Sequence, residues 1–176
     1  MRALGPGSVS SLLKTALDVA YWALWIILAL VVGAFIFSFF IPLAQFDVTL
    51  DGASGPIDAP LSRALIAYVI VFAAGSIGAF IFIVANLRQV FRTLAAGDPF
   101  DADNVRRLRR IGLALIGVVV LQVAFGPLLS LLYPQADVTL DLGDLIVPVF
   151  SVMTIFVLAE VFREGARLRR EQELTI

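Results

Sequence analysis

The sequence predicts an all-α membrane protein with four transmembrane helices and both termini in the cytoplasm. Hydrophobic residues make up 60% of the 176-residue chain and charged residues 15%, whereas a soluble domain is about 45–50% apolar. The apolar residues form four long stretches, each close to the roughly 20 residues that a helix needs to cross a bilayer. Helices are expected because backbone exposed to lipid has to satisfy its hydrogen bonds within the segment.

The chain is predicted to form one integral membrane domain, residues 1–176, with its charges sorted between two sides. The spans are placed near residues 17–41, 61–85, 111–132 and 145–162. A basic cytoplasmic segment, 86–110, joins the second span to the third, and a charged cytoplasmic tail follows at 163–176. Twelve of the 13 Lys and Arg residues lie on one side, and Arg63 alone lies on the other. Basic residues accumulate on the cytoplasmic side, so both termini are expected there.

The helices that flank the central basic segment are predicted to extend beyond the bilayer. Apolar residues continue at helical spacing after the second span, up to Gly97, a natural C-terminal stop. Pro99 prevents continuation of that helix, and Asp101 is a suitable N-cap for the next one. We therefore expect one long helix over residues 102–132.

Two sequence matches suggest an internal repeat of two hairpins. Asp-Val-Thr-Leu-Asp occurs at 47–51 and at 137–141, and Leu-x-x-Val-Phe-Arg occurs at 87–92 and at 158–163. Chance similarity between apolar segments is the alternative explanation. The pentapeptide alternates polar and apolar residues, as a strand does, so the two copies are expected to pair as a short two-stranded outer β lid. Their aspartates are interpreted as a solvated acidic edge in preference to a cation site, because no loop has the ligand spacing of a calcium site.

Basic residues near the bilayer are the candidate contacts for lipid or for a partner protein. Anchoring to anionic lipid headgroups is the favoured interpretation, and a docking patch for a partner is the alternative. No direct nucleic-acid binding is expected, because aromatic residues are not interleaved with these charges. The candidates are Arg106, Arg107, Arg109, Arg110, Arg167, Arg169 and Arg170.

Two further polar features lie within or at the edge of the spans. Gln122 is near the middle of the third span and is predicted to form an interhelical hydrogen bond. Glu160 is near the inner end of the fourth span, and an ion pair with a basic residue such as Arg92 is expected there. A transport path or a proton relay would normally need more polar lining than these residues supply.

The composition argues against catalysis. The chain contains no Cys and no His, so thiolate chemistry, Ser-His-Asp triads and the commonest metal ligand are missing. No P-loop, hydrolase elbow or zinc motif occurs. We therefore expect no enzyme activity, no cofactor and no metal site.

Two stretches resemble a known family. One is the Gly-x-Pro-Phe turn at 97–100 followed by Asn104, and the other is the ending Glu-x-Glu-Leu-Thr-Ile at 171–176. They resemble the bacterial domain-of-unknown-function family 2975, small integral membrane proteins with four predicted spans. The resemblance implies a bacterial cytoplasmic (inner) membrane protein without an assigned activity. It also implies a helix-turn-helix regulator as a partner, because members are often encoded beside one.

Three functions are compatible with this sequence. The first is a non-enzymatic sensor or regulatory partner of a helix-turn-helix transcription factor. The second is a small transporter or an export or immunity protein, in which Gln122 would line the path. The third is a structural subunit of a homo-oligomer, assembled through the small residues of the second span.

Overall fold

The computed structural model describes residues 9–41, 47–52, 55–60, 62–98, 100–134 and 142–173. Its elements in chain order are α1 (Val9–Ser38), β1 (Asp47–Gly52), β2 (Gly55–Pro60), α2 (Arg63–Ala95), α3 (Ala102–Leu132) and α4 (Leu142–Glu173). All four helices are long and apolar enough to cross a membrane. The predicted set of four long apolar helices is therefore confirmed.

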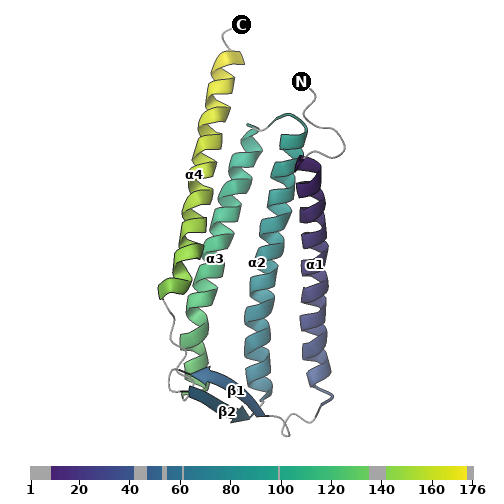
Figure 1. Cartoon of the computed structure of the whole chain (residues 1–176), viewed down its shortest axis with the longest axis vertical. Coiled ribbons are helices and arrows are strands. Elements are labelled where there is room, and N and C mark those ends of the chain that lie inside the picture. Colours follow the sequence, from purple (N-terminus) through teal and green to yellow (C-terminus); the bar gives the residue numbers. More distant parts are fainter. Residues whose placement is uncertain are drawn as a thin grey trace.

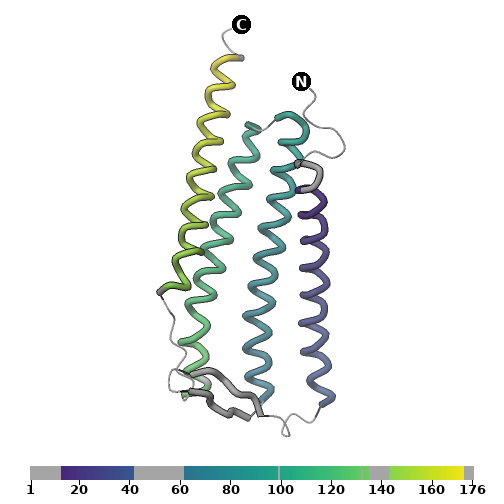
Figure 2. Tube along the Cα trace, viewed as in Figure 1, coloured from purple at the N-terminus to yellow at the C-terminus, as the bar shows by residue number. Residues whose placement is uncertain are grey.

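The helices stand in a row in chain order, with α2 between α1 and α3, and α3 between α2 and α4 (Figures 1 and 2). Neighbouring helices run in opposite directions. One end of this bundle contains the start of α1, the turn between α2 and α3, and the end of α4 (Figure 1). We call it the basic end. The strands lie at the opposite end, which we call the hairpin end.

The last three helices are longer than a membrane span requires. They contain 33, 31 and 32 residues, which corresponds to about 45–50 Å at 1.5 Å per residue. A hydrocarbon core is only about 30 Å thick. Each helix therefore continues from its apolar part into the arginine-rich residues of the basic end without a break, as the sequence predicts for α2 and α3.

The turn between α2 and α3 follows the predicted stop and start signals. Gly97 has a φ of +83°, a left-handed conformation that other residues adopt at a cost. Its N–H donates to the carbonyl of Leu94 at 3.1 Å, and the N–H of Asp98 donates to that of Thr93 at 3.0 Å. Asp101 then caps α3, where its Oδ1 accepts from the N–H of Asp103 at 2.7 Å.

The β lid requires correction. The first copy of the repeated pentapeptide does form a strand, β1, but β1 pairs antiparallel with β2, in register from Asp47 opposite Pro60 to Gly52 opposite Gly55. The second copy, 137–141, lies outside the described residues. Two strands separated by two residues in sequence close at a small entropic cost, whereas pairing the two copies would join segments about ninety residues apart. The local hairpin is the pairing that the structure has.

Two apolar clusters hold the row together. At the basic end, Leu108 and Ile111 of α3 are buried against Ala159 of α4, with residues of α2 packed beside them. At the hairpin end, Leu65 of α2 packs on Leu129 of α3. Most other large apolar side chains in the described helices are exposed, as expected for surfaces that face lipid.

A hydroxyl network reinforces the hairpin end. The Ser62 side chain accepts from the N–H of Leu65 at 3.1 Å and contacts the Tyr133 hydroxyl. The Tyr68 hydroxyl donates to the backbone carbonyl of Phe125, and the two rings lie 5.2 Å apart. These contacts join the start of α2 to the end of α3.

Candidate functional site

Asn104 is the polar centre of the basic end. It lies in the first turn of α3 and its side chain is 0% exposed. Its amide group exchanges hydrogen bonds with the Thr93 hydroxyl of α2, at 2.6 and 2.9 Å, and its Oδ1 also accepts from Nη1 of Arg107 at 2.9 Å. Because a buried amide without partners is costly, these bonds fix the relative position of α2 and α3.

The neighbouring arginines have different roles. Arg107 is 18% exposed at its side chain and donates from Nε to Oε1 of Gln89 at 3.1 Å, so it joins α3 to α2. Arg106 is exposed and pairs with Asp103 of its own helix. Arg109 and Arg110 are exposed on the following turn. Of the four candidates in this segment, Arg107 is thus mainly structural and the other three are accessible.

The turn between α2 and α3 is attached to the charged part of α4. The Phe100 ring lies against Gly165, where a Cβ would come within 2.4 Å of two ring atoms. The same ring packs beside Phe162, with centroids 5.8 Å apart. Asp98 forms an ion pair with Arg169, one turn beyond Gly165. The extended part of α4 is therefore held on the turn by an aromatic contact and by a charge pair.

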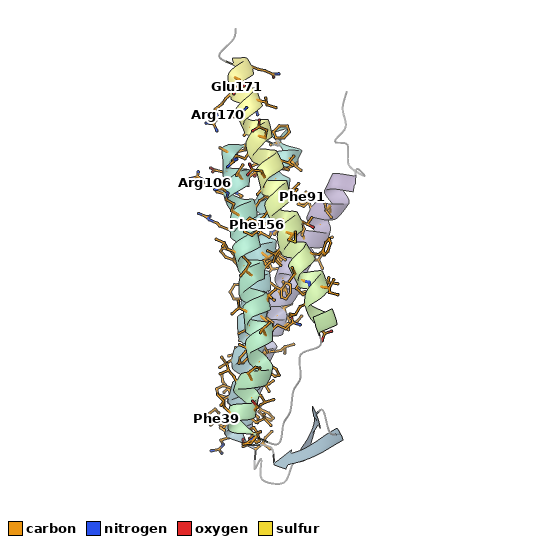
Figure 3. All side chains as sticks on the ribbon, turned by 90° about the vertical axis from the view of Figure 1, so that its left-hand side faces the viewer. Phe39, Phe91, Arg106, Phe156, Arg170 and Glu171 are labelled. Carbon is orange, nitrogen blue, oxygen red and sulfur yellow. The ribbon has the colours of Figure 1, made fainter. Side chains whose placement is uncertain are left out.

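A polar depression of about 370 Å³ lies beside this attachment. It is lined by Asp98, Phe100, Asp101, Ala102, Ala166, Arg169 and Arg170. Arg170 is exposed, and Figure 3 shows it on the same side of the molecule as Arg106. Arg167 forms ion pairs within α4 instead, with Glu164 at 3.2 Å and with Glu171 at 3.3 Å.

The ion pair predicted for Glu160 has a different partner. Glu160 pairs with Arg163, one turn further along α4, and not with Arg92. Arg92 is exposed and lies instead in a small depression between α1 and α2, together with Arg88 and Tyr21. A residue three positions away on the same helix reaches the carboxylate more readily than one on α2, which is separated from α4 by α3.

Arg88 forms the contact between α1 and α2 that the sequence did not predict. Its Nη2 lies 2.5 Å from Oδ1 of Asp18, and its guanidinium lies 4.5 Å from the centre of the Tyr21 ring. The Arg88 side chain is 19% exposed. Arg88 is a basic residue at the membrane edge, and Asp18 is an acidic residue at the start of a span, but no short spacing links them.

Gln122 does not form the interhelical hydrogen bond that was expected. Its side chain is exposed in a groove between α2 and α3, and within the described part of the chain it has no hydrogen-bond partner. No group of three or more potential metal ligands occurs among the described residues.

Four long apolar helices with charged extensions at one end define a multi-pass membrane protein. The chain belongs to the family described as "Protein of unknown function (DUF2975)", which matches residues 55–176. The resemblance noted from the sequence is thereby confirmed. The matched part contains the attachment of the turn to α4, including Gly97, Phe100 and Gly165. Comparison with curated proteins and with solved structures finds no match.

Proposed function

We propose that this protein is a non-enzymatic regulatory protein of the bacterial inner membrane, whose basic end lies in the cytoplasm and binds a soluble partner. The observation that supports this function is the attachment of α4 to the turn between α2 and α3. Phe100, Gly165 and the Asp98–Arg169 pair hold the charged extension of α4 in a fixed place. A docking surface benefits from such preorganisation, because less conformational entropy is lost on binding.

The charge of this surface points to the kind of partner. Arg169 and Arg170 line a polar depression at the basic end, and the exposed arginines of α3 lie on the same end of the bundle. A protein with an acidic patch would be attracted to them. The family resemblance suggests that this partner is a helix-turn-helix regulator. Those same arginines would hold the protein at anionic lipid headgroups when the partner is absent.

The orientation and the repeat are further parts of this proposal. The basic end carries Lys14 and most of the arginines, and Arg63 lies at the hairpin end, which favours a cytoplasmic basic end. The two sequence matches favour descent of the α1–α2 and α3–α4 pairs from one duplicated hairpin.

Co-purification from native membranes tests the function. The chain is isolated in mild detergent, and proteins bound to it are identified by mass spectrometry. We expect a helix-turn-helix regulator to be retained by the unaltered chain. The variant Arg106→Glu/Arg170→Glu, which reverses two charges on one side of the basic end (Figure 3), should lose it.

The control is Arg63→Glu, which reverses a charge at the hairpin end and should retain the regulator. A second variant that lacks residues 171–176 tests whether the end of the tail contributes to binding the regulator. Retention of the same proteins by the charge-reversed chain would contradict a docking surface at the basic end. If the Arg63→Glu control loses the regulator as well, the loss is due to a general effect of the substitutions on folding or charge.

A further inference from the structure

A groove between α2 and α3 contains two polar groups at similar depths in the apolar region. The groove has a volume of about 530 Å³ and is lined mostly by apolar side chains, with Ser76 and Gln122 as its polar members. A Cβ on Gly75 would lie 3.2 Å from Cδ2 of Leu121. Gly75 and Leu121 face each other, and α2 and α3 run in opposite directions, so the next residues, Ser76 and Gln122, differ in depth by only about 3 Å at 1.5 Å per residue.

Neither polar group has a partner in this chain as far as the structure describes it. The Gln122 amide and the Ser76 hydroxyl both lack a hydrogen bond. Other hydroxyls in the spans behave differently. Ser130, Ser151 and Thr154 each donate to a carbonyl of their own helix at 2.8 Å. Since the hydrocarbon region holds no water to bind a free amide, a group from outside the described part of this copy is needed to satisfy Gln122.

We propose that the groove is the contact surface for a second copy of this chain. Two copies inserted in the same direction are related by a twofold axis along the membrane normal. Such an axis places each residue opposite itself at the same depth. A carboxamide both donates and accepts, so two Gln122 side chains facing each other satisfy one another, with the Ser76 hydroxyls beside them.

The shape of the groove also suits a second helix layer. Ala73 and Gly126 line it, and small residues let transmembrane helices approach closely. A lipid acyl chain would fill the volume but would offer no hydrogen-bonding group to Gln122. The surface differs from the stripe of small residues on the second span, Ala74, Gly75, Gly78 and Ala79. Gly75 of that stripe already packs on Leu121 within the chain.

Association in vesicles tests the role of Gln122. The full chain is labelled with donor and acceptor dyes and reconstituted at a series of protein-to-lipid ratios, and energy transfer is measured. Replacing Gln122→Leu should weaken association by roughly 5- to 30-fold, the effect of losing about one or two polar contacts between helices. Gln122→Asn, which keeps a carboxamide, should retain more association than Gln122→Leu. Unfolding of the monomer should be unchanged, because Gln122 has no described partner within it.

Cross-linking tests the geometry, and the absence of native Cys makes each result specific. Val118→Cys lies in the groove one turn from Gln122, and Val120→Cys lies at a similar depth on the opposite side of α3, 61% exposed. A short thiol cross-linker should join two 19.0-kDa chains through Val118→Cys and not through Val120→Cys. Adding Gln122→Leu to Val118→Cys should reduce the product.

Each alternative outcome overturns the proposal. These outcomes are a chain that is monomeric at every protein-to-lipid ratio, a Gln122→Leu variant that associates as strongly as the unaltered chain, and a Val120→Cys variant that cross-links in preference to Val118→Cys. A different membrane protein or a lipid that co-purifies in place of a second copy, and is lost with Gln122→Leu, would assign the groove to that occupant instead.

Discussion

Asn104 shows how much one polar side chain contributes to the arrangement of the basic end. It begins α3, has no exposed surface, and bonds both to Thr93 of α2 and to Arg107 of its own helix. Arg107 in turn reaches Gln89 of α2. A short chain of hydrogen bonds thus spans two helices at the point where the turn between them would otherwise allow them to separate.

Replacing Asn104→Ala should lower the free energy of unfolding by about 1–3 kcal/mol, because the Thr93 hydroxyl and the Arg107 guanidinium lose a shared partner in a buried place. Chemical unfolding of the full chain in detergent micelles measures the loss. The comparison is Arg106→Ala, which removes a solvent-exposed pair within one helix and should leave the free energy of unfolding almost unchanged. Equal losses in the two variants would show that the Asn104 network does not stabilise the fold.

Residue-level partners were harder to foresee than the elements that contain them. Adjacent arginines on α3 point about 100° apart, and this rotation alone separates the partly buried Arg107 from the exposed Arg106. Which side of α3 is buried depends on where α2 and α4 pack against it. Glu160 illustrates the same limit, since its actual partner is Arg163 of the same helix and the expected one was Arg92 of another.

At the scale of elements, helix limits follow from local chemistry. Gly97 ends α2 by adopting a positive φ, and Asp101 begins α3 by accepting a backbone hydrogen bond. Both signals are contained in a few consecutive residues, so the sequence predicts them. The partner of β1 was harder to predict. Sequence similarity pointed to the second copy of the pentapeptide at 137–141, whereas β1 pairs with the neighbouring strand β2.

The contact between α1 and α2 gives a prediction at this scale. Arg88→Leu should destabilise the α1–α2 pair by about 1.5–3 kcal/mol, because it leaves Asp18 without its cation near the membrane edge. The double variant Asp18→Leu/Arg88→Leu should recover part of that loss, since no unpaired charge remains. A double-mutant cycle of unfolding free energies measures the coupling, and additive losses would indicate that the two side chains act independently.

The whole molecule is a row of helices in which α1 packs mainly on α2 and α4 mainly on α3 (Figure 1). The family match begins at residue 55 and covers α2, α3 and α4, so the attachment at the basic end lies within the matched part and the Asp18–Arg88 pair extends beyond it. The hydrophobic pattern gives little information about the order of the helices in the row, because the lipid-facing and helix-facing sides of a span are both apolar. The four spans were therefore predictable, whereas their order in the row was not.

The orientation of the whole molecule in the membrane can be tested by labelling its two ends. In cells or sealed vesicles, a membrane-impermeant thiol reagent should label Ala96→Cys, at the basic end, only from the cytoplasmic side. Asp144→Cys, at the opposite end of the bundle, should be labelled only from the outer side. Both positions are exposed and the chain has no other Cys. If both variants are labelled from the same side, α3 does not cross the membrane as proposed. If the pattern is reversed, the basic end faces outward.

The pairing of Asp18 with Arg88 also bears on the order in which the protein is made. Synthesis runs from the N-terminus, so Asp18 enters the membrane region long before Arg88 has left the ribosome. Until then the first helix has an acidic group near the bilayer edge without its counter-charge, and Tyr21 has no cation over its ring. The helical hairpin can close only after the second helix has crossed and its arginine has returned to the starting side. The ion pair that joins the two helices in the finished structure can therefore form only after the second helix has been inserted.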